Sequence, residues 1–329
     1  MSLENKKVLV TGGAGFIGSN IIEYLLNKNN KVTCLDNFMT GKKENVENFL
    51  SNPNFKMIDG DITNLQDCLK ACKDIDVILH QAALGSVPRS IENPLKTNDI
   101  NINGFINILW AAKQENISRV VYAASSSTYG DSKKLPKIED EIGSPLSPYA
   151  VTKYVNELYA GVFSNLYGLE LIGLRYFNVF GRKQDPDGAY AAAIPKFIKA
   201  FINHQEPVIH GDGSQSRDFT YIDNVIQANE LAATTKNPNA LNQVYNIACG
   251  EQSFLKELVE NLKELLSGFD SEIKKIEIKS GPERIGDVKH SLASIEKAKK
   301  LLNYQPSHDV KQGLNSAIEW YWNYFKTNS

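Results

Sequence analysis

Thr11-Gly12-Gly13-Ala14-Gly15-Phe16-Ile17-Gly18 follows a short apolar run near the start of the chain and precedes a segment with helical periodicity. Glycines at positions 12, 15 and 18 allow a tight turn, admit a pyrophosphate and bring a helix close to a sheet. The helix N-terminus adds unpaired N–H groups and a dipole that favours phosphate. Because the glycines stand between a strand and a helix, this stretch predicts the first βαβ unit of a dinucleotide-binding domain.

A carboxylate, Asp36, ends the second apolar run, 18 residues after Gly18. In a βαβ unit it can accept hydrogen bonds from both ribose hydroxyls, and its charge would repel a 2′-phosphate. The cofactor indicated is therefore NAD rather than NADP. Asp61-Ile62 follows the third apolar run and is placed to flank the adenine, although this pair could equally be no more than a strand end.

Short β-branched runs alternate with amphipathic segments through the first half of the chain. We expect strands at residues 7–11, 32–36, 55–59, 76–80, 119–125 and 169–175, and helices near 16–28, 64–72, 95–115 and 149–167. Several of the runs are apolar almost throughout, as parallel strands covered on both faces are. The alternation predicts an α/β fold, a Rossmann-like doubly wound parallel sheet.

The pattern loosens after about Phe177, where glycine, proline and short helical pieces become more frequent. A strand over 244–248 follows a helix near 223–235, and helices near 253–266, 291–302 and 309–326 complete the chain. We predict an NAD-binding domain over 1–178 and a smaller, mixed α/β substrate-binding lobe over 179–329. Part of 220–248 could return to the first domain.

The net charge is −2 and acidic and basic residues are well mixed, so there is no basic stripe for nucleic acid. No apolar stretch approaches the roughly 20 residues of a membrane span, and the N-terminus does not read as a secretory signal. We expect a soluble, cytoplasmic protein. Cys68 and Cys72 share a helix face without a histidine nearby, so we expect no metal.

Tyr149 and Lys153 are four residues apart and would share one face of the helix near 149–167. Ser147 can cap this helix, Pro148 suits its first turn and Gly168 can end it. An ammonium close to a phenol lowers the phenol pKa, and a phenolate can act as a general base towards a hydroxyl. The alternative is a Tyr and a Lys on a solvated helix face.

Five motifs, in this order and spacing, resemble those of the extended short-chain dehydrogenase/reductase family over nearly the whole chain. They are Thr11–Gly18, His80-Gln81-Ala82-Ala83, Ser125-Ser126-Ser127-Thr128-Tyr129-Gly130, Tyr149 with Lys153, and Arg175-Tyr176-Phe177-Asn178-Val179-Phe180-Gly181. The resemblance implies that Tyr149 is the base, that Lys153 holds the nicotinamide ribose and lowers the Tyr149 pKa, and that Ser125 hydrogen-bonds the reacting oxygen.

The same resemblance implies a set of residues that hold the cofactor. They are Gly12, Gly15, Phe16, Ile17, Gly18, Asp36, Asn37, Asp61, Ile62, Gln81, Ala82, Ala83, Tyr149, Lys153 and Tyr176.

The serine loop separates the reactions that resembling enzymes carry out on nucleotide sugars. Dehydratases of this kind have an Asp-Glu pair here, because elimination of water needs an acid and a second base, and UDP-glucuronate decarboxylases have a Glu. This chain has only hydroxyl side chains from Ser125 to Thr128. Oxidation followed by re-reduction needs no further acid, so 4-epimerisation is the expected reaction.

The C-terminal lobe resembles a UDP-sugar pocket. Asn178 would contact the diphosphate, Lys196 would lie near the uracil, Arg217 and Arg284 would hold phosphate oxygens, and Asp287 would bind the uridine ribose. Read singly, each of these is more often a surface ion pair. The full set implied for the substrate is Gly85, Ser86, Ser125, Ser126, Ser127, Tyr149, Asn178, Ala192, Lys196, Arg217, Arg284, Asp287 and Ser291.

Gly85-Ser86 and the runs from Gln184 to Ala192 and from Gly286 to Ser291 resemble those of the UDP-N-acetylhexosamine 4-epimerases. A Tyr at the position of Ser291 would close the pocket near the sugar 2-substituent, whereas Ser leaves room for an acetamido group, and Gly85 and Ala192 are also small. We therefore expect interconversion of UDP-GlcNAc and UDP-GalNAc, with UDP-Glc and UDP-Gal as a further pair. Small residues at a rim can also be mere packing.

Two alternative functions stay open beside this expected reaction, and the sequence also suggests how the chain assembles. The substrate could instead be UDP-glucuronate or its N-acetylglucosaminuronate analogue, although we can place no cation to face the carboxylate. A non-catalytic NAD-binding scaffold is a third interpretation, but such proteins usually lose Tyr149 or Lys153. Helices 95–115 and 149–167 could pair across a two-fold axis, and we expect a homodimer.

Overall fold

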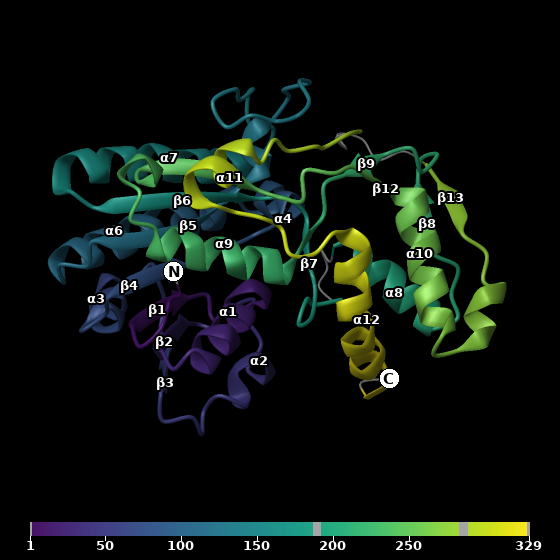
Figure 1. The fold of residues 1–329 in the computed structure, drawn as a ribbon, viewed down its shortest axis with the longest axis horizontal. Coiled ribbons are helices and arrows are strands. Elements are labelled where there is room, and N and C mark those ends of the chain that lie inside the picture. Colours follow the sequence, from purple (N-terminus) through teal and green to yellow (C-terminus); the bar gives the residue numbers. More distant parts are fainter. Residues whose placement is uncertain (1, 187–191, 283–288, 328–329) are drawn as a thin grey trace.

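The computed structural model describes residues 2–186, 192–282 and 289–327. A large sheet with helices on both faces fills one end of the molecule, and the smaller C-terminal elements α8, α10 and α12 lie at the other end (Figure 1). No helix within these described ranges is long and apolar enough to cross a membrane.

Seven parallel strands form the large sheet, in the order β11-β6-β5-β4-β1-β2-β3. Their bounds are β1 Lys7–Thr11, β2 Lys31–Asp36, β3 Phe55–Asp59, β4 Val77–His80, β5 Arg119–Ser125, β6 Glu170–Tyr176 and β11 Gln243–Ile247. The order reverses between β1 and β4, which makes their carboxyl ends the switch point of a doubly wound sheet. The predicted fold class is confirmed.

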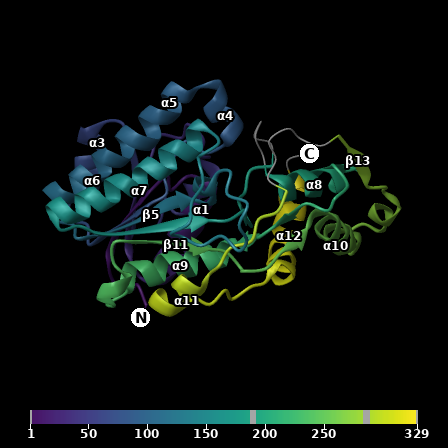
Figure 2. The same ribbon diagram turned by 90° about the horizontal axis from the view of Figure 1, so that it is seen from above.

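Two helical layers cover this sheet. α1 (Phe16–Asn27) and α9 (Ile222–Thr234) pack on one face, and α3 (Leu65–Cys72), α6 (Gly104–Gln114) and α7 (Pro148–Tyr167) pack on the other. Figure 2 shows α6 and α7 above the sheet and α9 below it. Successive residues of each strand face opposite layers, which is why apolar residues run through the strands without alternation.

One helix differs from its prediction over 95–115. The segment divides into α5 (Pro94–Asn98), a π-helical turn η1 (Asp99–Asn103) and α6. Within the wide turn, the Asn101 side chain accepts from Leu84 N at 2.7 Å and donates to Leu84 O at 3.2 Å. It also donates to Thr152 Oγ1 at 3.0 Å. The turn thus ties the loop after β4 to the helix that carries Tyr149.

Two further short helices, α2 (Glu44–Glu47) and α4 (Val87–Glu92), were not predicted. The helix predicted near 291–302 is shorter than expected, because α11 spans only Glu296–Leu302. Residues before it are extended instead, since Lys137 pairs with the backbone around Ala293 and Ser216 pairs with His290.

The remaining elements build the C-terminal part of the molecule. Three two-stranded sheets pair β7 with β10, β8 with β13 and β9 with β12, and α8, α10 and α12 pack on one another. Their bounds are β7 Val179–Phe180, α8 Ala193–Ile202, β8 Val208–His210, β9 Ser216–Arg217, β10 Thr220–Tyr221, β12 Ser253–Phe254, α10 Leu255–Ser267, β13 Lys279–Gly281 and α12 Val310–Thr327.

Segments after residue 178 also contribute to the large sheet and its cover. β11 adds to the sheet beside β6, while α9 packs on β5 and β6 and α11 packs on β11. Part of 220–248 therefore lies with the N-terminal elements. The boundary at residue 178 stays a prediction.

Candidate active site

A cleft of about 470 Å³ opens at the carboxyl ends of β1 to β4, at the switch point of the sheet. Ligands of doubly wound folds bind at this place. The residues singled out from the sequence that line it are Gly12, Gly15, Phe16, Ile17, Gly18, Asp36, Asn37, Asp61, Ile62, Gln81, Ala82, Ala83, Gly85, Ser86 and Ala192.

The glycine loop has the shape of a phosphate cradle. Gly12 has φ +68°, and a Cβ there would lie 2.7 Å from the Ala82 backbone. At Gly18 a Cβ would lie 2.2 Å from Gly12 O, so only glycine lets α1 approach this closely. At Gly15 a Cβ would meet only Gly12 O, at 3.2 Å, so this glycine is open towards the cleft. A side chain at Gly15 would occupy the space that a pyrophosphate needs.

The Asp36 carboxylate is fixed at the end of β2. It accepts hydrogen bonds from Ala14 N at 2.9 Å and Phe38 N at 2.8 Å. Burial raises the pKa of Asp36 above its usual value, and these two hydrogen bonds oppose the rise. The carboxylate is therefore anchored to the glycine loop and faces the cleft, as a ribose acceptor would be.

Asp61 and Asn37 meet beside Asp36. Asn37 Nδ2 donates to Asp61 Oδ2 at 2.7 Å, and Thr63 donates to Asp61 Oδ1 through both its N–H and its hydroxyl. Burial raises the pKa of Asp61, but the hydrogen bonds from Thr63 and Asn37 outweigh it and the net shift is downward. An ionised Asp61 can accept a hydrogen bond from an adenine amino group.

A third set of contacts fixes the floor of the cleft. Tyr176 donates from its hydroxyl to Gln81 Oε1 at 3.0 Å and accepts from Asn229 Nδ2 at 2.8 Å. Gln81 Nε2 donates to Asn229 Oδ1 at 3.1 Å. The side chains of Gln81 after β4, Tyr176 on β6 and Asn229 on α9 thus hold one another in place. Together with the cradle and Asp36, they fit NAD.

Tyr149 and Lys153 lie on the first two turns of α7, which begins after the Ser147 cap: Ala150 N donates to Ser147 Oγ at 3.1 Å. Lys153 is buried, and its Nζ donates to Ala123 O at 2.7 Å and lies 6.0 Å from the Tyr149 ring centre. Burial lowers the Lys153 pKa to about 8, and the Glu157 carboxylate opposes that fall.

The lowering of the Tyr149 pKa by Lys153 stays a prediction. Burial raises the pKa of the Tyr149 phenol, and a hydrogen bond with Ser125 offsets part of the rise. The ammonium of Lys153 is directed to the Ala123 carbonyl on β5. The serine loop, rather than the lysine, makes the direct contact with the phenol.

Ser125 ends β5, and Ser126 and Ser127 begin the short helix η2 (Ser126–Tyr129). Ser127 donates to Ser125 Oγ from its N–H at 3.1 Å and from its hydroxyl at 2.9 Å. Because β5 and α7 pack together, Ser125, Tyr149 and Lys153 form one cluster. The cluster brings together a phenol, serine hydroxyls and a lysine amine.

Some of the residues expected at the substrate come together in the C-terminal part. The backbone at 289–291 runs beside β9, because Ser216 N donates to Lys289 O and Ser291 N donates to Ser216 O, each at 3.1 Å. Ser291 therefore lies next to Arg217. Lys289 O and Ser216 O also accept from Arg217 Nη1, so this guanidinium is oriented along the same segment.

Other substrate residues are more scattered. Asn178 is exposed at φ +35° and donates to Asp218 O at 3.0 Å, and Lys196 is exposed on α8. Arg284 and Asp287 lie outside the described residues. Within the described ranges, no group of three His, Cys, Asp or Glu side chains is placed to hold a metal ion.

Several residues that line the cleft were not singled out as site residues, and three of them have long polar or charged side chains: Arg89, Gln184 and Asp185. Arg89 lies on α4, and its Nη1 donates to Gly85 O at 3.2 Å. Ser86 caps this helix and Pro88 stands in its first turn, a combination that predicts a helix start. That signal would have placed Arg89 one turn inside the helix and near Gly85.

Known proteins resemble this chain over its whole length. The model of the NAD dependent epimerase/dehydratase family matches residues 8–248. A UDP-N-acetylglucosamine 4-epimerase from Methanobrevibacter ruminantium, solved in complex with UDP-N-acetylmuramic acid, is 40% identical with a TM-score of 0.91, covering 99% of this chain and 100% of its own.

Two further relatives are similar over the same extent. A UDP-glucose 4-epimerase from Thermotoga maritima, solved with UDP-glucose, is 32% identical with a TM-score of 0.87 and covers 98% of this chain and 100% of its own. A UDP-glucuronate 4-epimerase from Thermodesulfobacterium geofontis is 36% identical over 323 residues, which are 95% of each chain.

Proposed function

Since the chain belongs to the NAD dependent epimerase/dehydratase family, we propose that it inverts C4 of a UDP-N-acetylhexosamine, interconverting UDP-GlcNAc and UDP-GalNAc. It is an NAD-dependent UDP-sugar 4-epimerase. The observation that carries the reaction type is the cluster of Ser125, Tyr149 and Lys153 beside the dinucleotide cleft, in which the serine loop offers hydroxyls and no carboxylate. Such a loop serves oxidation and re-reduction but not elimination.

The protein groups have these roles in the reaction. Tyr149 takes the proton of the sugar 4-hydroxyl and returns it to the 4-oxygen after the 4-keto sugar has turned its other face towards the nicotinamide site. Ser125 donates a hydrogen bond to the 4-oxygen, and Lys153 supplies the positive charge that favours the phenolate. NAD held by the glycine loop and Asp36 would supply the hydride chemistry at C4, accepting the hydride from one face of the sugar and providing it to the other. The cofactor is regenerated in every turnover, so Gly15 and Asp36 need to retain it rather than exchange it.

The open space at the rim of the cleft supports the proposal that the substrate carries an N-acetyl group. A Cβ built at Gly85 would meet no atom within 4 Å, and Ala192 lines the same cleft. Ser291, beside Arg217, is small as well. We propose that these residues leave space for the acetamido group. The same pocket would then accept UDP-Glc and UDP-Gal, which lack that group.

A substrate panel tests this proposal. Purified protein without added NAD should convert UDP-GlcNAc to UDP-GalNAc, as sugar proton NMR would show. Ser291→Tyr should reduce turnover of UDP-GlcNAc and spare UDP-Glc, whereas Ser291→Ala should leave both unchanged. Absence of product from every UDP-hexose, with NAD still bound, would instead support a non-catalytic scaffold.

A second candidate substrate is a uronate, and one observation favours it. Arg89 lines the cleft beside Gly85 and Ser86, and it would be the cation facing a sugar carboxylate that the sequence alone could not place. Its planar guanidinium suits a carboxylate. Faster turnover of UDP-glucuronate than of UDP-GlcNAc, lost in Arg89→Gln, would favour this candidate over the proposed one.

We also propose a homodimer formed through α7. Val151, Leu158, Val162 and Leu166 follow one another along this helix, and their exposed fractions are 46%, 53%, 49% and 68%. On a monomer this apolar stripe would face water, and a two-fold axis would bury it against its copy. Leu158→Glu should give a monomer in light scattering, whereas Leu50→Glu, at a residue 60% exposed elsewhere, should not.

A further inference from the structure

A buried ion pair joins the catalytic helix to the sheet. Glu157 on α7 and Arg175 on β6 have side chains only 7% and 4% exposed. Arg175 Nε donates to Glu157 Oε1 at 2.8 Å, and Nη2 donates to Oε2 at 2.7 Å. The pair is bidentate, so both carboxylate oxygens are held by one guanidinium.

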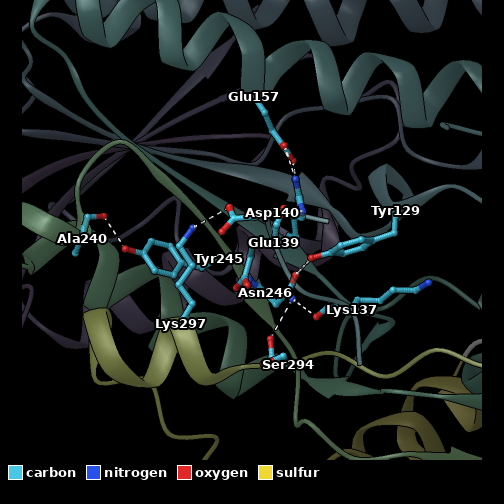
Figure 3. A network of polar contacts seen from close by, with 11 residues as sticks. Tyr129, Lys137, Glu139, Asp140, Glu157, Ala240, Tyr245, Asn246, Ser294 and Lys297 are labelled. Carbon is cyan, nitrogen blue, oxygen red and sulfur yellow. Dashed lines mark hydrogen bonds and ion pairs between the residues drawn. The ribbon is translucent and has the colours of Figure 1, made fainter. Parts of the chain in front are cut away.

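A wider network holds the guanidinium in turn. Arg175 Nη1 donates to Glu139 O at 2.9 Å, and the guanidinium lies 4.8 Å from the centre of the Tyr129 ring. Tyr129 donates to Asn246 Oδ1 at 2.6 Å. Figure 3 shows Glu157 above this network, which continues through Asn246 to Ser294. Glu157 therefore has little freedom to move.

Lys153 lies one helical turn before Glu157, and residues four apart share a helix face. Lys153 is 2% exposed, so its charged form has lost most of its hydration. Within the described part of the chain it forms no ion pair. Burial lowers the Lys153 pKa, and the negative charge of Glu157 opposes this fall.

The other titratable groups around Lys153 do not supply that charge. On β4, burial and the Lys153 charge lower the pKa of His80 to about 3, so it is neutral. On β6, burial raises the pKa of Tyr176, and Arg175 is positive and paired with Glu157. On α7 itself, burial raises the pKa of Tyr149, and a hydrogen bond with Ser125 opposes the rise.

We propose that Glu157 is a positioning residue of the active site, whose clamped carboxylate keeps Lys153 in its ammonium form. The inference rests on the proposed role of Lys153. Because Arg175 occupies both oxygens of Glu157, the carboxylate acts on Lys153 through space without taking its hydrogen bonds. The three N–H bonds of Lys153 stay available for Ala123 O and for a cofactor ribose. Arg175 thus prevents a direct Lys153–Glu157 ion pair that would turn the ammonium away from the cleft.

Glu157→Gln tests the proposal, because glutamine keeps the shape and one acceptor for Arg175 but removes the charge. We expect the alkaline limb of the kcat profile to move down by about one pH unit or more. At pH 8.5 the variant should be roughly tenfold slower than the wild type, and near pH 6 the two should converge. The amount of NAD retained after gel filtration should fall over the same pH range.

A control ion pair of the same chemistry also involves β6. Arg119 on β5 holds Glu170 on β6 through Nε at 2.9 Å and Nη2 at 2.7 Å, at the end of the sheet away from Tyr149. Glu170→Gln should leave the profile and the NAD retention unchanged. An unshifted profile in Glu157→Gln, or an equal loss at every pH, would overturn the proposal.

A double variant covers the case in which Glu157→Gln does not fold because Arg175 is left unpaired. Glu157→Gln with Arg175→Met removes both charges of the pair, and we expect a downward shift of the alkaline limb that is smaller than in Glu157→Gln, because the positive charge of Arg175 is lost as well. An unshifted limb in the folded double variant would overturn the proposal. If the wild type epimerises no UDP-sugar, the proposed function fails. NAD retention as a function of pH still tests the effect of Glu157 on Lys153.

Discussion

Ser127 holds the hydroxyl oxygen of Ser125 with two hydrogen bonds, one from its backbone N–H at 3.1 Å and one from its own hydroxyl at 2.9 Å. A serine oxygen has two lone pairs, so both are occupied. The Ser125 proton is then free to point at another acceptor. The hydrogen bond that lowers the Tyr149 pKa is consistent with Ser125 donating to the phenol oxygen.

This arrangement predicts unequal effects of two alanine substitutions. Ser125→Ala removes the donor to the reacting oxygen and should lower kcat about 10- to 100-fold. Ser127→Ala keeps the backbone hydrogen bond and loses only the second one, so kcat should fall about 3- to 10-fold. Steady-state kinetics on the preferred UDP-sugar measures both. A Ser127→Ala enzyme as impaired as Ser125→Ala would mean that Ser127 itself contacts the substrate.

Removal of the phenol hydroxyl separates catalysis from cofactor binding. Tyr149→Phe should lower kcat by about 10²- to 10⁴-fold, because the proton no longer has an acceptor. The folded cleft and the Lys153 contact to Ala123 do not depend on that hydroxyl. The variant should therefore keep its NAD, measured by absorbance after release from the protein. An active Tyr149→Phe enzyme would require another base.

The sheet and the cofactor loop could be predicted because their signals are local. The strands at Lys7–Thr11, Phe55–Asp59 and Arg119–Ser125 have the predicted bounds. Glycines and carboxylates that directly follow a strand predict a ligand site at the carboxyl edge of the sheet from their position in the sequence alone. Each of these signals needs only the identity of neighbouring residues.

Features that depend on distant partners could not be predicted. The π-helical turn at Asp99–Asn103 accommodates contacts of Asn101 with Leu84, and α11 begins late because the preceding backbone pairs with Ser216 and Lys137. Likewise, the spacing of Tyr149 and Lys153 gave their shared face but not the burial that raises the phenol pKa. Burial is a property of the packed molecule rather than of a spacing.

Two glycines of the loop offer a matched pair of substitutions. A Cβ at Gly15 would meet only Gly12 O, at 3.2 Å, so Gly15→Ala should change Tm by less than about 2 °C in the absence of cofactor. It should nevertheless abolish NAD retention, since the methyl group projects into the phosphate cradle. Calorimetry and released NAD give the two readouts.

Gly18→Ala should behave differently. Its Cβ would lie 2.2 Å from Gly12 O and 2.7 Å from Gly13 Cα. These are backbone atoms, which cannot move aside as easily as the end of a flexible side chain. Overpacking of this kind should lower the free energy of unfolding by about 1–3 kcal/mol. Full NAD retention in Gly15→Ala would show that the phosphates do not approach this glycine.

His80 gives the protein a pH-dependent stability of known sign. It is buried on β4, and its Nδ1 lies 2.8 Å from Thr11 Oγ1. Burial and, to a lesser extent, the Lys153 charge lower its pKa to about 3, whereas an unfolded chain titrates histidine near 6.5. Between these values the unfolded state binds more protons, so the stability present above pH 6.5 is lost as the pH falls. This one group contributes up to ~1.4 kcal/mol per pH unit.

His80→Gln removes that titration while keeping an acceptor for the Thr11 hydroxyl. We expect the variant to be less stable than the wild type at pH 7.5, because the packing with Phe105, whose ring centre is 5.4 Å away, is lost. Towards pH 5 the difference should shrink, since only the wild type must keep a histidine neutral. Urea unfolding at pH 5, 6 and 7.5, with NAD in fixed excess, measures both curves. Parallel curves would show that His80 takes up its proton without unfolding, and that the pocket around Lys153 admits a second positive charge.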